Sequence, residues 1–125
     1  MTVSRQKQLN NSMKQKTRKQ IKDMHEELSS EPRMFQCENC GSKRNIERNH
    51  ALFYAGKKME EPYALRALCA NCHRLKNNNR PVKRADLVCK IHAITDGLQH
   101  LKANYPKRDW KQDLKRYLED FKHYL

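Results

Sequence analysis

Two pairs of cysteines in the middle of the sequence have the spacing of metal ligands. The stretches CENC and CANC each place two cysteines three positions apart, and 28 residues separate the two pairs. Two thiolates from each of two tight turns suit the tetrahedral coordination of a structural zinc ion, with Zn–S bonds of about 2.3 Å. We therefore expect one zinc ion held by Cys37, Cys40, Cys69 and Cys72.

The second pair is followed directly by His73, and Cys-x-x-Cys-His strings also attach c-type haem. Haem is disfavoured because Cys69 and Cys72 already have partners in the first pair, and because the N-terminal residues contain no apolar export segment. We expect a cytoplasmic or nucleoid-associated protein in a reducing compartment, where paired cysteines bind metal more often than they form disulfides. The fifth cysteine, Cys89, is expected to be a buried small hydrophobic residue.

The charge of the chain indicates a polyanionic partner. Its 125 residues include 27 Lys and Arg against 14 Asp and Glu, which gives a formal net charge of +13. The excess is spread along the chain, and a distributed positive field attracts nucleic acid. No apolar run approaches the roughly 18 residues needed to cross a membrane. DNA is therefore the expected partner, and a membrane is not.

The pattern of apolar residues predicts an α+β fold that is mostly helical, in three parts. Residues 1–33 form a basic N-terminal helix, residues 34–80 a core stapled by zinc, and residues 81–125 a helical hairpin packed on that core. Only 37% of the residues are hydrophobic and 33% are charged, so the core is small and a metal ion would help to stabilise it.

The two ends of the chain are read as helices from their periodicity and their breaks. The first helix runs from about Ser4 to Ser29 and ends before a proline in SSEPR. In the C-terminal part, NYPKRD separates two helices, and Asp109 can cap the second. Apolar stripes follow both helices, through Leu87, Ile91, Ile94, Leu98 and Leu101 and through Trp110, Leu114, Tyr117, Phe121 and Tyr124. The stripes are ordinary core, or part of them forms a homodimer interface.

Between the cysteine pairs the sequence predicts two strands, followed by a helix. The first strand runs from Asn45 to about Tyr54, with a bend near Asn49, and the second lies in PYALRAL before Cys69. The stretch HRLKNNN after Cys72 is expected to start a helix. The predicted order is knuckle, strand, loop, strand, knuckle and helix.

From Cys37 to Lys76 this order resembles the HNH endonucleases, which have the ββα-metal fold, in the variety with two Cys-x-x-Cys zinc knuckles. The layout is also similar to that of phage endonuclease VII, which resolves branched DNA. The resemblance is carried by the two cysteine pairs, by the dipeptide Asn49-His50 and by LCANCHRLK. It implies a metal-dependent endonuclease that hydrolyses phosphodiester bonds in DNA, on branched or recombining substrates.

The resemblance also implies roles for single residues. His50 would act as the catalytic base that activates water, and a neutral imidazole can accept a proton at neutral pH. A catalytic divalent ion, Mg²⁺ or Mn²⁺, would be held by Asn49 and His73, with Glu47 as a further candidate. Contacts with nucleic acid are expected from basic residues around these positions, namely Arg48, Lys57, Lys58 and Lys76.

Two positions differ from the family pattern and leave other functions open. Asn49 stands where most members have Asp or His, and YAL at 63–65 stands where an asparagine is usual. The first alternative is a non-catalytic, zinc-stabilised DNA-binding protein with a decayed HNH site. The second is a small zinc-bridged module that binds a protein partner, which the positive charge disfavours.

Overall fold

The computed structural model describes residues 17–77 and 84–125 and has an α+β fold that is mostly helical, as predicted. Residues 4–16 of the predicted first helix and residues 78–80 of the polar tract lie outside the described part. The described α-helices are α2 (Arg18–Ser29), α3 (Ala70–Asn77), α4 (Arg84–Asn104) and α5 (Trp110–Phe121). The strands are β1 (Ile46–His50), β2 (Phe53–Tyr54), β3 (Lys57–Lys58) and β4 (Leu65–Cys69). Short 3-10 helices occupy η1 (Pro32–Phe35), η2 (Pro62–Ala64) and η3 (Lys122–Tyr124).

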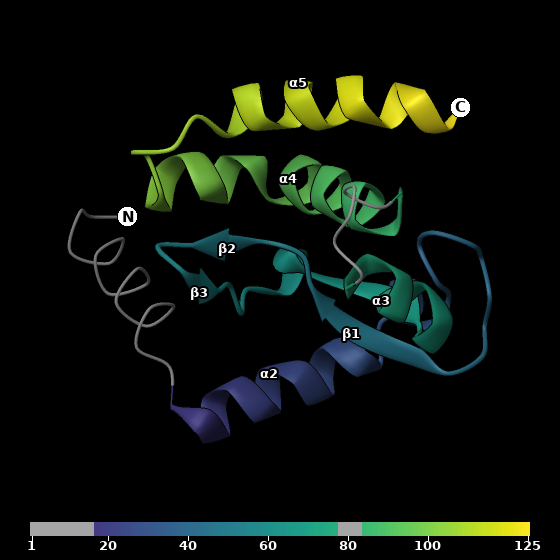
Figure 1. The fold of residues 1–125 in the computed structure, drawn as a ribbon. Helices are drawn as coiled ribbons and strands as arrows, with labels where there is room; N and C mark the ends of the chain where they lie inside the picture. Colours follow the sequence, from purple (N-terminus) through teal and green to yellow (C-terminus); the bar gives the residue numbers. More distant parts are fainter. Residues whose placement is uncertain (1–16, 78–83) are drawn as a thin grey trace.

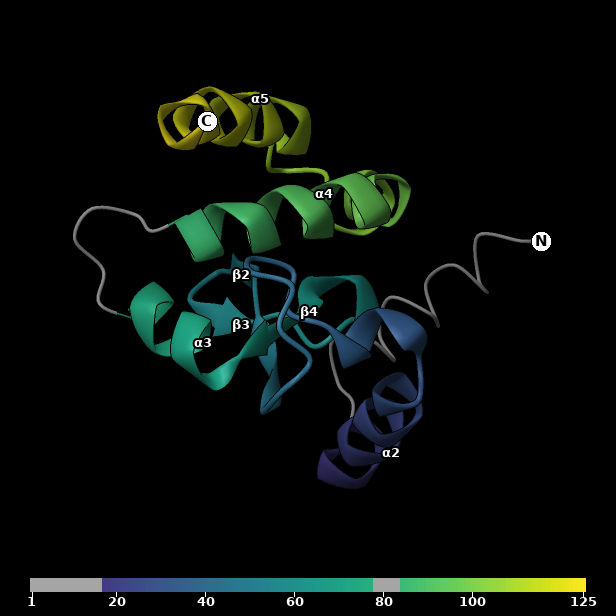
Figure 2. The same cartoon turned by 90° about the vertical axis from the view of Figure 1, so that its right-hand side faces the viewer.

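The elements are stacked in layers (Figure 1). Helix α5 lies on α4, α4 lies on one side of the strands, and α2 lies on the other side. The view turned by 90° keeps this order and places α3 beside the strands (Figure 2). The strands therefore sit between the C-terminal helices and α2.

The central feature is an antiparallel hairpin of β1 and β4. Its register runs from Ile46 opposite Cys69 to His50 opposite Leu65. Every residue of β4 is buried, whereas β1 buries only Asn49 completely. This pairing brings the second cysteine knuckle beside the start of β1.

The predicted strand from Asn45 to Tyr54, with a bend near Asn49, is divided into β1 and β2, because the chain leaves the ladder after His50. Ala51 turns inward, is fully buried and donates its N–H to the carbonyl of Ala64 over 2.8 Å. The chain then forms a separate hairpin in which β2 pairs with β3. Ala55 and Gly56 have φ angles of 52° and 79°, which are typical of a tight two-residue hairpin turn.

The other predicted boundaries shift by a few residues. The second strand covers only Leu65–Cys69, because Pro62 starts a 3-10 turn that interrupts the extended chain. Helix α3 begins at Ala70 rather than after Cys72, so the second knuckle is itself part of the helix. The described part of the first helix starts at Arg18, where Thr17 and Gln20 form a reciprocal capping box.

Helices α4 and α5 form the predicted C-terminal hairpin and supply much of the core. Asp109 caps α5 by accepting a hydrogen bond of 3.0 Å from the Gln112 N–H, as predicted. The first apolar stripe points into the core, with Leu87, Ile94 and Leu101 almost fully buried. The second stripe is buried at its start, at Trp110, and becomes more exposed toward the C-terminus. Among the described helices, none has the length and apolar character required to span a membrane.

Candidate metal centre and candidate active site

The four predicted zinc ligands come together from two knuckles. Cys37 and Cys40 lie in the turn after η1, Cys69 ends β4, and Cys72 lies in the first turn of α3. Gly41 adopts a φ of 80°, which closes the first turn so that its N–H reaches the carbonyl of Cys37. The four Sγ atoms all lie within 4.8 Å of one another. The predicted cysteine cluster is therefore present and could bind a zinc ion.

The geometry of the cluster fits zinc in two further respects. A tetrahedron with Zn–S bonds of about 2.3 Å has S···S edges of about 3.8 Å, and the Sγ atoms of Cys40 and Cys69 are 3.7 Å apart. In both knuckles the N–H of the second cysteine points at the sulfur of the first, at 3.5 Å for each pair. Such N–H donors stabilise thiolate sulfurs.

Burial and hydrogen bonds shift the pKa values of the thiols in the cluster in opposite directions. Burial opposes ionisation of Cys37, but the backbone N–H groups of Cys40, Cys69 and Asn39 outweigh it and lower its pKa to about 7. Burial raises the pKa of Cys72 to about 12. Burial and the neighbouring sulfurs thus oppose ionisation of Cys72, and a divalent cation would favour the thiolate form of all four cysteines.

Charged side chains tie the first knuckle to β4 and α4. Arg66, which is only 5% exposed, donates from Nε to both oxygens of Glu38 and from Nη1 to Asp96 Oδ2 over 2.8 Å. Burial acts to raise the pKa of Glu38, but the hydrogen bond with His92 and the charge of Arg66 prevail and lower it. Arg84 at the start of α4 donates to the carbonyl of Asn39 over 2.9 Å. The cysteine cluster is thus anchored to the C-terminal hairpin.

A second group of ligand-type side chains surrounds the predicted catalytic histidine. His50, at the end of β1, has its Nε2 atom 2.9 Å from Oε1 of Glu60. His25 of α2 has its Nε2 atom 2.9 Å from Oε2 of the same carboxylate. The two imidazole rings are 6.0 Å apart between centroids. Within the described residues, His25, His50 and Glu60 are the second group that could hold a metal ion.

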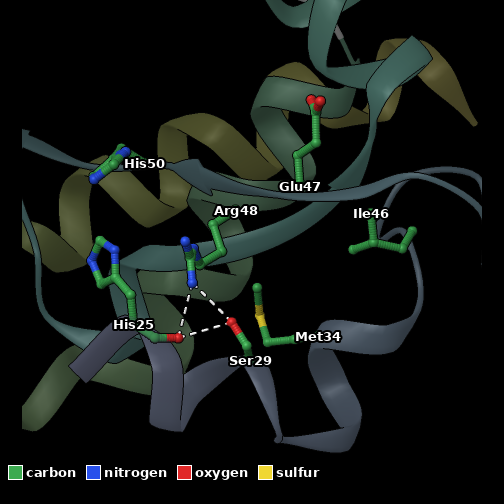
Figure 3. Close-up of a pocket in the computed structure, with 7 residues that line it drawn as sticks. All are labelled: His25, Ser29, Met34, Ile46, Glu47, Arg48 and His50. Carbon is green, nitrogen blue, oxygen red and sulfur yellow. Dashed lines mark hydrogen bonds between the residues drawn. The ribbon is translucent and has the colours of Figure 1, made fainter. Parts of the chain in front are cut away.

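This group borders a pocket between α2 and β1 with a volume of about 550 Å³ (Figure 3). Arg48 lies between the strand and the helix, where its Nη1 atom donates to the carbonyl of His25 and to Ser29 Oγ over 2.9 and 2.8 Å. The pocket therefore combines two imidazoles with a guanidinium group. It is lined by His25, Ser29, Met34, Ile46, Glu47, Arg48 and His50.

The predicted ligands His73 and Glu47 meet, but on the other face of β1. Nδ1 of His73 lies 2.8 Å from Oε1 of Glu47. Successive side chains of a strand point to opposite faces, and Figure 3 shows Glu47 pointing away from Arg48. The structure thus joins His73 to Glu47 and joins His50 to a different carboxylate, that of Glu60.

Asn49 is not placed as an accessible ligand. Its side chain is 1% exposed and contacts the thiol of Cys89, which is fully buried as predicted. The remaining pair, one carboxylate and one imidazole, fits Mg²⁺ poorly because this hard ion prefers several oxygen ligands. Of the residues predicted to hold the catalytic ion beside the base His50, His73 and Glu47 are in contact, and Asn49 is buried.

The predicted nucleic-acid contacts fall in different places. Arg48 belongs to the pocket, while Lys57 and Lys58 are exposed on β3. Lys76 is near the end of α3, and its side chain is outside the part that the structure describes. A neighbouring hollow of about 360 Å³ extends the pocket along α2, and it is lined by Arg18, Ile21, Lys22, His25, Glu26 and Arg48.

Sequence reasoning missed His25 and Glu60. His25 lies in a polar helix outside the cysteine-rich core, and Glu60 is one of two adjacent glutamates in a loop. Neither has a spacing relationship to His50 that would single it out, because the contact depends on how α2 docks. The chain matches no protein-family model, no curated protein and no solved structure.

Proposed function

We propose that this chain is a DNA endonuclease of the HNH type, with zinc in the cysteine cluster and hydrolysis of a phosphodiester bond at the pocket between α2 and β1. The observation that carries the proposal is the environment of His50. Its imidazole is held by the Glu60 carboxylate, 2.9 Å away, next to Arg48 and an open pocket. The order β1, β4, α3 with a knuckle at each side supports the ββα-metal fold.

The chemistry required is activation of a water molecule and stabilisation of charge on the phosphate. An imidazole can activate water by accepting its proton, as the sequence predicts for His50. It can also do so by helping to hold a divalent cation, which lowers the pKa of bound water. Both routes need His50. In the first route the Glu60 carboxylate fixes the orientation of the imidazole, and in the second Glu60 could share the cation with His50.

Arg48 supplies the positive charge that a phosphate needs. An arginine has five N–H donors in a planar fork, and the contacts with His25 and Ser29 use only Nη1. These contacts hold the guanidinium against the pocket wall. The adjoining hollow adds Arg18 and Lys22 along α2, which supports a path for the nucleic-acid backbone toward His50. The net charge of +13 supports DNA as the substrate.

The test is cleavage of supercoiled and branched DNA by the purified full chain, with Mg²⁺, with Mn²⁺ and with chelator. The expected result is nicking that depends on the divalent ion and that falls by about 10²–10⁴-fold in His50→Ala. His123→Ala is the matched control, because His123 is exposed in the C-terminal turn η3.

Retention of zinc and of DNA binding by His50→Ala would locate its defect in the chemical step. A wild type that binds DNA but never nicks it would favour the second candidate, a non-catalytic DNA-binding protein. Burial of Asn49 at the position usually occupied by a ligand supports that candidate.

A further inference from the structure

We propose that His25, His50 and Glu60 form a second metal site, for a divalent transition-metal ion such as Zn²⁺, Mn²⁺ or Co²⁺. The site differs from the cysteine cluster in ligands and in position. It is built from helix α2, from the end of strand β1 and from the loop before η2. No pattern in the sequence joins these three positions.

The distances between the ligand atoms fit one shared ion. The two imidazole nitrogens lie 2.9 Å from different oxygens of Glu60, and all three ligand atoms lie within 4.8 Å of one another. Neighbouring nitrogen and oxygen ligands around an ion with bonds of about 2.0–2.2 Å are separated by about 3.0 Å in octahedral and about 3.4 Å in tetrahedral coordination. Replacing the N–H protons of the two hydrogen bonds with one cation therefore needs little movement of these side chains.

The donor set selects the class of metal. Two imidazoles and one carboxylate form the protein ligands of many catalytic zinc sites, and a similar set binds non-haem iron. Magnesium is disfavoured because it prefers oxygen ligands and retains several waters. Three protein ligands also leave at least one coordination position open, which is the arrangement of a catalytic rather than a structural site.

The three side chains are accessible enough for a bound ion to coordinate a further ligand from solution. The side chains of His25, His50 and Glu60 are 14%, 23% and 26% exposed, so the group is sheltered but reachable. The adjoining pocket holds Arg48, whose charge would draw an anion such as a phosphate group to the open position. This choice of anion rests on the proposed function, whereas the metal site itself does not.

A bound ion would give His25 a role as a ligand and would change the role of His50. His50 becomes a ligand, and activation of water depends on the ion instead of on direct proton transfer to the imidazole. Glu60 becomes the ligand that connects the two histidines. The catalytic ion would then lie on the α2 face of β1, away from Glu47 and His73.

The test is a Co²⁺ titration of the full chain with the cysteine cluster already loaded with zinc, combined with elemental analysis. One further equivalent of Co²⁺ should bind, with visible absorption bands but without the strong near-ultraviolet absorption of thiolate ligands. His25→Ala and Glu60→Gln should each weaken this binding by at least about 10²-fold, since even loss of a residue that only supports a ligand costs 10–100-fold. The control His123→Ala should bind Co²⁺ as the wild type does.

Circular dichroism and retained zinc would establish that each variant is folded. A folded wild type that takes up no second equivalent, or a His25→Ala variant with unchanged Co²⁺ affinity, would overturn the metal site. Binding of Co²⁺ without DNA cleavage would instead remove the nuclease proposal alone. Chelator-resistant cleavage without a second metal equivalent would leave the nuclease and remove this site.

Discussion

His50 and His73 serve opposite faces of strand β1, although the sequence predicts that both act in one catalytic centre. His50 meets Glu60 on the side of α2, and His73 meets Glu47 on the side of α3. If hydrolysis takes place in the pocket at α2, His25→Ala should slow DNA cleavage more than His73→Ala does. Initial rates of plasmid nicking at matched protein and Mn²⁺ concentrations provide the comparison. The reverse order would return the catalytic ion to the α3 face.

Zinc binding should depend on the cysteine cluster and not on the remaining cysteine. Cys72→Ser is expected to lose the bound zinc and to unfold the hairpin of β1 and β4, because binding of a structural metal is coupled to folding. Cys89→Ala is the control, because this thiol lies fully buried in α4 outside the cluster. Elemental analysis and far-ultraviolet circular dichroism report the two properties. A folded Cys72→Ser protein that retains a full equivalent of zinc would contradict the prediction.

Asn49→Asp should destabilise the protein instead of improving a metal site. Asn49 is 1% exposed and lies beside Cys89, so an ionised carboxylate there would lose its hydration. The free energy of unfolding is expected to fall by about 1–3 kcal/mol, measured by urea denaturation. Asn45→Asp, at an exposed position just before β1, is the matched control and should change stability little. Unchanged stability with faster cleavage in Asn49→Asp would restore position 49 as a ligand.

DNA binding should weaken as salt rises, with a linear relation between the logarithms of the affinity and the salt concentration. Residues 1–16 contain four Lys and Arg residues and no acid. Their deletion should lower the affinity and reduce the salt slope by about 0.9 for each DNA phosphate that these residues neutralise. Fluorescence anisotropy with unrelated DNA sequences measures both quantities. An unchanged slope after deletion would show that this segment neutralises no phosphates.

His100 should make the protein less stable in weak acid. Burial lowers the pKa of its imidazole, and within the described residues its Nε2 atom has no hydrogen-bond partner. As the pH falls, the His100 imidazole of the unfolded chain, with a pKa near 6.5, is therefore protonated before that of the folded protein. The stability contributed by neutral His100 is complete above about pH 6.5 and is lost as the pH falls through the lowered folded pKa. Differences in urea-unfolding free energy between wild type and His100→Phe, measured from pH 8 to pH 5, test this.

The substituted ring in His100→Phe can keep the contact with Tyr63, whose ring centroid lies 5.3 Å from that of His100. The comparison therefore isolates titration from packing. Loss of zinc in acid would affect both proteins equally. A constant difference in unfolding free energy across this pH range would contradict the assigned cause.

The sequence predicts the cysteine cluster well because its signal is local. Cys-x-x-Cys spacing fixes each knuckle, and two such pairs leave few other uses for four thiolates. The C-terminal helices could be predicted equally well. Their apolar stripes repeat with the period of a helix, and the capping residue Asp109 directly precedes the second of them. The strand prediction was wrong at Ala51, where burial of a small side chain and one backbone hydrogen bond to Ala64 end the ladder. Periodicity alone does not contain that tertiary contact.

The pocket was harder to predict because its residues come from distant segments. His25 and Glu60 are 35 positions apart and belong to residue types that are common on surfaces. Their meeting depends on the docking of α2, in which buried Leu28 packs with Met34, Leu65 and Ala67. The sequence could identify His50 only through the neighbouring cysteine motifs.

Because α2 supplies His25, the pocket at His50 depends on the docking of this helix, whereas the cysteine cluster does not. The four thiolates and the hairpin lie within residues 37–72, whereas His25 reaches the pocket from outside that range. Proteins open in parts, and a helix held by one small apolar cluster and a few polar contacts can detach at a lower free energy than global unfolding. Mild heat or low denaturant would then withdraw His25 from Glu60 while the cysteine cluster remained closed. Loss of the proposed activity would then occur at a lower temperature or denaturant concentration than loss of zinc from the cysteine cluster.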